Sequence, residues 1–289
     1  MTAGADWPTQ EWDIDGGGET LHVRADGDPA RPSLLMLHGL LGSMRWFDRV
    51  VPMLLPSLRV VRIDLAGFGR STDHQGGRGP EDQARLVMNV MQELRVQPVA
   101  TLGHSLGATI AVALAEGGFA TGDLIVLSEG PDYTVANPPR VNTVLRAPLI
   151  GPLLWKRLPD SALRNGLAGF FAAGFDLEGA FDDRRRPLLD ARRVSHRTFA
   201  TTQGTKERYA AVKPLDARIA SLGTRSLVLF GPDDDTFDAA VSIARYDRLP
   251  HVRTALVPGT GHSPMLEDPA TTARHVVEFL TRSSNETGT

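Results

Sequence analysis

The sequence predicts an α/β fold in which a mostly parallel sheet is covered by helices on both faces. Short apolar runs alternate with amphipathic helical segments over residues 33–127 and again over 226–281, and this order of elements builds such sheets. The alternation stops at residues 131–221, where helical periodicity is punctuated by prolines and no buried strand is recognised. We therefore predict a core of residues 1–130 and 222–289 with an inserted helical cap at 131–221.

The first half of the core begins with a hairpin at the edge of the sheet. Residues 11–14 and 19–24 flank three consecutive glycines and predict its two strands. Residues 33–37 are continuously apolar, which is typical of a strand buried on both faces. Apolar residues then recur at helical spacing over 46–54, a strand follows at 59–63, and residues 81–94 place their apolar side chains on one helical face.

The later core elements follow the same rhythm. Residues 98–102 predict a strand, and residues 109–116 a helix that ends before Gly117-Gly118. Residues 124–127 predict the last strand before the cap. After the cap we expect a strand at 226–230, a helix at 238–248, a strand at 253–257 and a closing helix at 270–281.

Ser105 lies where the strand at 98–102 turns sharply into the helix at 109–116. Gly103 and Gly107 flank it and complete the G-x-S-x-G pattern of a nucleophile elbow. So tight a turn needs glycine at the flanking positions, because side chains there would collide with the neighbouring strand and helix. The helix also directs its N-terminal amides towards the serine. The pattern indicates a nucleophilic serine.

An activated serine needs a base within hydrogen-bond reach and a third group that orients the base. His262 follows the last predicted strand in a glycine-rich loop, at the edge of the sheet where α/β proteins place their sites. His104 is expected to point away from Ser105 and to pack. The other histidines considered lie within predicted regular elements or surface segments: His22, His74, His196, His251 and His275.

The predicted orienting carboxylate is Asp234. It belongs to the run Asp233-Asp234-Asp235, which follows the strand at 226–230 at the same edge of the sheet. Asp233 and Asp235 are interpreted as solvated turn residues, although spacing alone does not separate the three. Glu129 follows another strand and is a rival for the role. The chain order Ser, Asp, His is the one expected for this architecture.

Composition limits the classes of partner. The chain has 289 residues, 42% of them hydrophobic and 22% charged, a net charge of −3 and no cysteine. Disulfides, thiolate catalysis and cysteine-bound metals are thereby excluded. No apolar run approaches the roughly 18 residues of a membrane span, and the N-terminus does not resemble a secretory signal. We expect a cytoplasmic protein that needs no metal or cofactor and binds a small-molecule substrate rather than nucleic acid or membrane; the oligomeric state stays open.

Outside the cap, the whole chain resembles α/β-hydrolase fold proteins of the esterase, haloperoxidase and C–C hydrolase type. Five motifs in the same order carry the resemblance. They are His38-Gly39 after a strand, Asp64-x-x-Gly67-x-Gly69-x-Ser71, the elbow at 103–107, Gly231-x-x-Asp234, and Gly261-His262 followed by Glu267 and Pro269. We expect Glu267-x-Pro269 to cap the final helix, with Pro269 in its first turn.

The resemblance implies a role for each matching residue. Ser105 would be the nucleophile, His262 the general base and then acid, and Asp234 the carboxylate that orients the histidine. The backbone amides of Leu40 and Leu106 would form the oxyanion hole. Serine at the elbow, where epoxide hydrolases and haloalkane dehalogenases carry aspartate, argues against those enzymes. The residues proposed to bind substrate are His38, Gly39, Phe170, Phe171 and Phe175, whereas Trp46 is interpreted as core.

These features predict a serine hydrolase acting on a small-molecule carboxylic ester, lactone or related acyl substrate. The alternatives are a C–C bond hydrolase, a non-hydrolytic lyase or cyclase, a cofactor-free haloperoxidase and a non-catalytic ligand-binding module. The C–C reading requires a cap arginine that faces the serine, and none is assigned. The cap holds 15 Lys and Arg against 9 Asp and Glu, so it either attracts an anionic substrate or carries solvated arginines. Its phenylalanines either line an acyl pocket or seat the cap.

Overall fold

A computed structural model describes residues 7–137 and 140–286, and its centre is a single eight-stranded sheet. The strand order is β1-β2-β4-β3-β5-β6-β7-β8. The pairs β1–β2 and β2–β4 are antiparallel, and every other pair is parallel. The strands are β1 Thr9–Asp15, β2 Thr20–Asp26, β3 Ser33–Leu37, β4 Arg59–Ile63, β5 Ala100–His104, β6 Asp123–Leu127, β7 Ser226–Phe230 and β8 Val252–Leu256.

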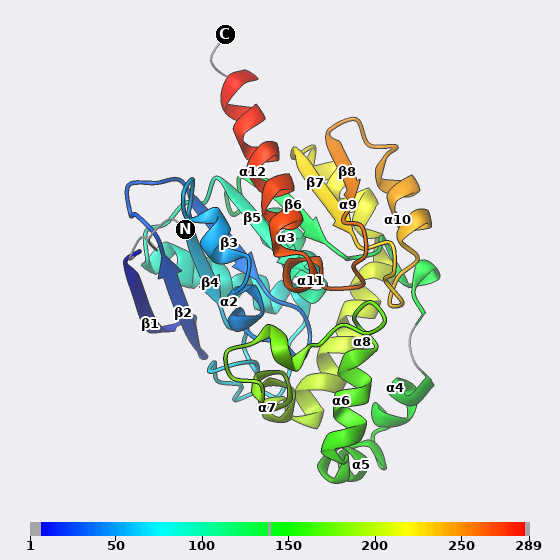
Figure 1. Ribbon diagram of the computed structural model, residues 1–289. Coiled ribbons are helices and arrows are strands. Elements are labelled where there is room, and N and C mark those ends of the chain that lie inside the picture. Colours follow the sequence, from blue (N-terminus) through cyan, green and yellow to red (C-terminus); the bar gives the residue numbers. More distant parts are fainter. Residues whose placement is uncertain (1–6, 138–139, 287–289) are drawn as a thin grey trace.

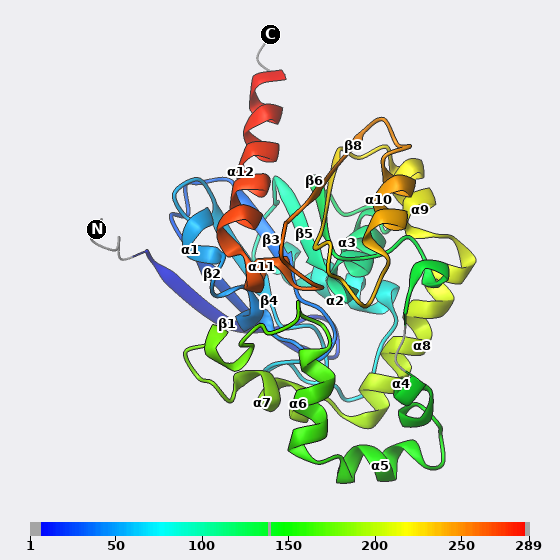
Figure 2. The ribbon, with the colours of Figure 1, turned by 45° about the vertical axis from the view of Figure 1, so that its right-hand side comes forward.

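Helices cover both faces of this sheet (Figures 1 and 2). On one face α3 packs against α2 and α9, and on the other α12 packs against α1 and α11; α10 contacts β7 and β8. These elements are η1 Met44–Phe47, α1 Val51–Leu54, α2 Pro80–Glu93, α3 Leu106–Glu116, α9 Leu215–Leu222, α10 Ala239–Tyr246, α11 Pro264–Glu267 and α12 Pro269–Glu286. The predicted fold class, a mostly parallel sheet flanked by helices, is confirmed.

Strands made of apolar runs have the boundaries that the sequence predicts. The continuous runs that form β3 and β7 are buried at every position. Elsewhere tertiary context moved the ends. The strand predicted from Pro98 begins at Ala100 and continues to His104, and the following helix begins at Leu106 rather than Thr109, because Gly103 and Gly107 allow the strand and the helix to approach each other closely around Ser105.

The segment between β6 and β7 gathers at one end of the sheet (Figures 1 and 2). Its helices are η2 Tyr133–Val135, α4 Arg140–Leu145, α5 Gly151–Arg157, α6 Asp160–Ala168, η3 Glu178–Ala180, α7 Arg186–Arg193 and α8 His196–Val212. The last helix before β7, α9, packs against α3 in the layer that covers the sheet. Residues 215–221, which the sequence predicted to be part of the cap, thus contact the core.

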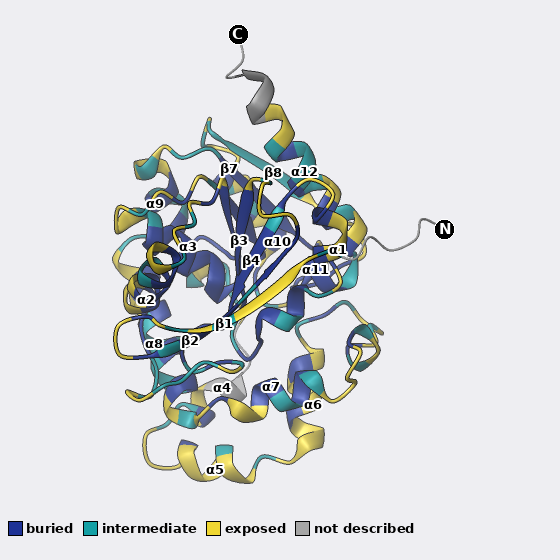
Figure 3. Cartoon of the chain, turned by 90° about the vertical axis from the view of Figure 1, so that its left-hand side faces the viewer, coloured by how far each residue is buried: buried dark blue, intermediate teal, exposed yellow. Residues whose placement is uncertain are grey.

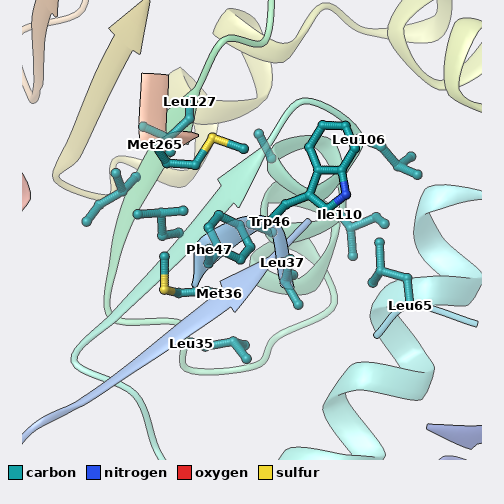
Figure 4. Packing of buried hydrophobic residues seen from close by; sticks show 14 of the residues in the cluster. Leu35, Met36, Leu37, Trp46, Phe47, Leu65, Leu106, Ile110, Leu127 and Met265 are labelled. Carbon is teal, nitrogen blue, oxygen red and sulfur yellow. The ribbon is translucent and has the colours of Figure 1, made fainter. Parts of the chain in front are cut away.

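The core is densely packed around the loops that follow β3 and β5. In Figure 4 Trp46 lies close to Leu106 and Ile110, and Phe47 lies near Met36; all are buried. Trp46 also contacts the rings of Phe171 and Phe181, so cap residues complete the core on this side. Within residues 7–137 and 140–286, no helix combines the length and apolar character needed to cross a membrane.

Candidate active site

Ser105 stands at the bend between β5 and α3, with backbone angles of φ 50° and ψ −117° that strain any residue other than glycine. The flanking glycines have no room for a side chain. A Cβ atom at Gly103 would lie 2.3 Å from the amide nitrogen of Ala108, and one at Gly107 would lie 2.1 Å from the carbonyl oxygen of Leu37. Close packing against β3 and α3 therefore holds the serine in its strained conformation.

His262 and Asp234 form a buried hydrogen-bonded pair. His262 Nδ1 lies 2.9 Å from Asp234 Oδ2. The other oxygen, Oδ1, accepts hydrogen bonds from the amides of Thr236 and Phe237, which fix the carboxylate. Because a carboxylate accepts, the hydrogen of this bond belongs to Nδ1, and in the neutral ring Nε2 is then an acceptor. Asp233 and Asp235 are exposed, as expected for turn residues.

Glu129, the rival for the orienting role, has a different partner. Its Oε2 accepts a 2.7 Å hydrogen bond from Lys206 Nζ on α8, and both side chains are buried. Burial raises the pKa of Glu129 above its usual value, against the attraction of Lys206. Burial by itself would lower the pKa of Lys206, but Glu129 and Tyr133 raise it, so the ammonium stays charged. Within the described chain, Glu129 therefore pairs with the ammonium of Lys206 and makes no hydrogen bond to His262.

The loop that carries His262 is fixed at three points. The amide of His262 donates to the carbonyl oxygen of Phe170 in the cap. Glu267 accepts hydrogen bonds from the amides of Gly261 and Ala172, so its carboxylate joins the loop to the cap instead of capping α12. Pro269 does begin α12, as expected.

His104 provides the third fixed point. Its Nε2 lies 2.8 Å from the carbonyl oxygen of His262, and the two rings are 5.1 Å apart. Burial and the neighbouring His262 hold the pKa of His104 well below its usual value, so the ring is neutral. The carbonyl oxygen can only accept, so Nε2 carries the hydrogen and donates. The sequence placed His104 away from the serine; in the structure it lines the same pocket.

Ser105 and His262 both line a pocket between the sheet and the cap, which spans about 850 Å³ with its open mouth included. Within the described residues no hydrogen bond joins their side chains; such bonds often tighten only in a substrate complex. No group of three or more potential metal ligands occurs in the described part of the chain. The other lining residues are Leu40, Trp46, His104, Leu106, Tyr133, Ala136, Arg146, Phe170, Thr202, Gln203, Lys206, Glu207, Thr236, Phe237 and Ser263.

The residues predicted to supply the oxyanion hole, Leu40 and Leu106, line this pocket beside Ser105. Leu106 is the first residue of α3, where an amide has no partner within the helix. Neither amide donates a hydrogen bond to any described part of the protein. Both are therefore available to an oxygen atom of a ligand.

Of the five residues predicted to bind substrate, Phe170 alone lines the pocket, with its ring 5.8 Å from that of His262. The nitrogens of His38 are occupied: Nδ1 donates to the carbonyl oxygen of Gly39, and Nε2 accepts from the amide of Leu65. Gly39 faces His104, whose Nδ1 would lie 2.8 Å from an added Cβ atom. Phe171 and Phe175 stack on each other at 5.2 Å and seat the cap.

One wall of the pocket was missed by sequence reasoning. Thr202 and Gln203 are neighbours on α8, Lys206 lies one turn further along, and all three contribute polar side chains. Arg146 also lines the pocket, and its guanidinium is held by the carboxylate of Glu207. The spacing of residues along α8 does not indicate which of its faces lines the pocket, because this depends on how the cap folds back over the sheet. The sequence pointed to this wall through Glu129, which follows a strand at the carboxyl edge of the sheet and is the partner of Lys206.

Comparison with known proteins agrees with this architecture. A putative aryl esterase from Burkholderia cenocepacia superposes with a TM-score of 0.79 at 21% identity, covering 96% of this chain and 100% of that one. An uncharacterized hydrolase of Bacillus subtilis is 22% identical over 94% of this chain and 98% of its own length. A 2-hydroxy-6-oxononadienedioate/2-hydroxy-6-oxononatrienedioate hydrolase of Cupriavidus pinatubonensis is 26% identical over 90% of both chains.

The family model described as "Alpha/beta hydrolase family" matches residues 34–275, which include the elbow, both members of the buried His–Asp pair and the whole cap. The match covers most of the chain, and the strand order, the strained serine and the relatives' names agree with it. The chain belongs to the alpha/beta hydrolase family.

Proposed function

We propose that this protein is a serine hydrolase that cleaves a small-molecule carboxylic ester, lactone or related acyl substrate. The observation that carries the proposal is the buried pair of His262 Nδ1 and Asp234 Oδ2, 2.9 Å apart, in a loop that opens on the pocket of Ser105. A histidine held in this tautomer presents its bare Nε2 as a base. The strained serine beside it is the group that such a base activates.

In the proposed reaction, Ser105 Oγ attacks the substrate carbonyl carbon while His262 Nε2 accepts the hydroxyl proton. The carbonyl oxygen becomes an oxyanion, to which the amides of Leu40 and Leu106 donate. Collapse of this intermediate breaks the bond to the alkoxy group, which takes the proton from His262 and leaves as the alcohol. Water then repeats the sequence on the acyl-serine ester, giving the carboxylic acid and the free serine. Asp234 stabilises the imidazolium at each step.

The polar wall of the pocket favours an uncharged acyl substrate over an anionic one. Lys206 is already neutralised by Glu129, and Arg146 by Glu207. A substrate carboxylate would therefore compete with a protein carboxylate for each cation. The arginine-rich stretch at 184–186 is outside the pocket-lining set, with Arg184 paired to Asp176 at the surface.

C–C bond hydrolysis is the second candidate, because the Cupriavidus relative is named for it and a cap arginine, Arg146, lines the pocket. C–C hydrolysis requires a cap arginine that faces the serine, and the sequence alone did not identify one. The bidentate contact of Arg146 with Glu207 leaves the guanidinium less available to a substrate carboxylate, which is why ester hydrolysis ranks first. Replacement of Glu207 by Gln would free the cation and should raise the affinity for anionic substrates.

A fluorophosphonate probe combined with a panel of p-nitrophenyl esters tests the proposal. We expect the wild-type protein to be labelled and to turn over at least one ester, and Ser105→Ala to lose both properties. Ser128→Ala is the matched control, since Ser128 also follows a strand with a positive φ, of 49°, but does not line the pocket. Labelling that survives Ser105→Ala would refute the assignment of the nucleophile. Labelling without turnover of any ester would favour the C–C candidate.

A further inference from the structure

The tip of the cap exposes an unusual concentration of large apolar side chains. Single exposed apolar residues are common, whereas a cluster marks an interaction surface. Ten large apolar side chains are exposed in the described chain, and five of them fall within residues 144–154. Figure 3 shows the exposed surface of α5 at the end of the molecule farthest from the sheet. The five, here called the cap-tip surface, are Val144 (46% exposed), Leu149 (93%), Ile150 (52%), Leu153 (54%) and Leu154 (41%).

The arrangement of α5 explains why this face stays uncovered. Trp155 is the residue of α5 that turns inward: its ring stacks on Phe199 at 4.5 Å, and its Nε1 donates to the carbonyl oxygen of Val194. Ile150, Leu153 and Leu154 are spaced at i, i+3 and i+4 and share another face of the helix. With Trp155 anchored to the cap, that face points to solvent.

The stretch of sequence that carries the cap-tip surface has charged residues of one sign. From residue 133 to 159 the sequence has no Asp or Glu but contains Arg140, Arg146, Lys156 and Arg157, in a chain whose net charge is −3. Lys156 and Arg157 are exposed in the last turn of α5 and form no ion pair within the described residues. Arg146 is paired with Glu207, so the basic charge beside the apolar side chains is that of Lys156 and Arg157.

We propose that the cap-tip surface binds the surface of an anionic lipid bilayer. Aliphatic side chains on one helix face with lysine and arginine at their edge fit the boundary between acyl chains and acidic headgroups. A protein partner is the poorer match, because the centres of protein interfaces are enriched in aromatic residues and depleted in lysine. The net charge of −3 and the lack of a long apolar run predict no membrane partner, but a peripheral contact requires neither a positive net charge nor a spanning segment.

The cap-tip surface is linked to the candidate active site through the segment that carries Arg146. Arg146 lies between α4 and α5, in the same segment as the exposed leucines, and it lines the pocket. The α5 helix also packs against α8, and Thr202 and Lys206 of α8 line the pocket. Docking at the tip would thus act on two elements of the pocket wall, while binding itself requires no catalysis.

Flotation of the full-length protein with lipid vesicles tests the proposal. We expect it to float with vesicles of phosphatidylcholine containing phosphatidylglycerol, to bind phosphatidylcholine alone much more weakly, and to be released by high salt. The double variant Leu149→Ser/Leu153→Ser should lower the partition coefficient by at least about tenfold. Lys156→Glu/Arg157→Glu should lose the preference for anionic vesicles. All four positions are exposed, so these changes leave the fold intact.

Two controls make the result specific. Val212→Ser removes an apolar side chain that is 82% exposed at the end of α8, outside the cap-tip surface, and should bind as the wild type does. Ser105→Ala should also bind normally, so failure of the hydrolase proposal and failure of this one are distinguishable. The proposal is overturned if the wild type floats with neither vesicle, or if the leucine double variant binds as well as Val212→Ser. A concentration-dependent dimer that the leucine variant abolishes, without flotation, would assign the surface to a second copy of the chain instead.

Discussion

The ammonium of Lys206 donates a 2.7 Å hydrogen bond to Glu129 Oε2, joining the cap helix α8 to the end of strand β6. The two side chains are 8% and 5% exposed. The aromatic rings of Tyr133 and Phe237 lie within 6 Å of the same Nζ. The buried ammonium of Lys206 and the buried carboxylate of Glu129 therefore compensate each other's charge, and removing either group leaves the other unpaired.

Breaking this pair from one side should destabilise the fold strongly. Lys206→Met leaves the Glu129 carboxylate buried without a partner, and we expect the free energy of unfolding to fall by about 3–5 kcal/mol. The double variant Lys206→Met/Glu129→Gln should recover most of this loss, because no buried charge remains. Urea denaturation measures both, with Lys156→Met as an exposed-lysine control expected to stay within about 0.5 kcal/mol of wild type. Equal stability of the single and double variants would contradict the argument.

The proposed catalytic residues should differ in severity. Ser105→Ala and His262→Ala should each lower kcat by about 10⁶, whereas Asp234→Asn should cost about 10⁴ by favouring the wrong tautomer of His262. Asp233→Asn, at the exposed neighbouring position, is the matched control and should retain activity. These effects are read from ester hydrolysis after circular dichroism has established folding. A greater loss for Glu129→Gln than for Asp234→Asn would move the orienting role to Glu129.

A pH effect on stability is expected from Asp190 on α7. The hydroxyl of Ser43 donates a 2.7 Å hydrogen bond to its Oδ2, and burial raises the pKa of Asp190 from 3.8 to about 6, although Ser43 and Arg186 oppose the shift. Between these two values the folded protein holds a proton that the unfolded chain has released. Stability therefore falls as pH rises from about 4 to about 6.

Replacing Asp190 by Asn removes this ionisation. The variant should gain stability relative to wild type as pH rises, by roughly 3 kcal/mol between pH 4 and pH 7, and the amide oxygen can still accept from Ser43. Urea titrations of both proteins at several pH values measure the difference. A difference that stays constant across this pH range would show that Asp190 does not hold its proton in the fold.

Phenylalanines of the cap should separate into two classes. Phe170→Ala enlarges the pocket beside His262 and should change the preference among esters of different acyl length by about 1–3 kcal/mol in kcat/KM. Phe175 does not line the pocket and packs where the cap meets the core. Phe175→Ala should lower stability and leave the order of preference unchanged. The same shift in preference from both variants would show that the cap acts as one unit on specificity.

The sequence by itself determined the class of fold and the positions of the chemistry-bearing loops. Continuous apolar runs specify strands buried on both faces, so β3 and β7 were predicted to the residue. The G-x-S-x-G pattern located the bend at Ser105, because the tight turn into the helix leaves no room for a side chain at Gly103. Short-range constraints of this kind are written in neighbouring residues and need no knowledge of the rest of the chain.

Tertiary structure alone decided which side chains meet across the pocket. Lys206 and Glu129 are far apart in sequence, and nothing in the periodicity of α8 shows which face turns to β6. The same is true of Phe170 and Phe175, which look equivalent in the sequence and both pack against the core, whereas Phe170 alone of the two lines the pocket. Glu267 was expected to cap a helix, yet it joins the His262 loop to Ala172. Each of these outcomes depends on how the cap folds back over the sheet, a long-range packing arrangement that no local pattern encodes.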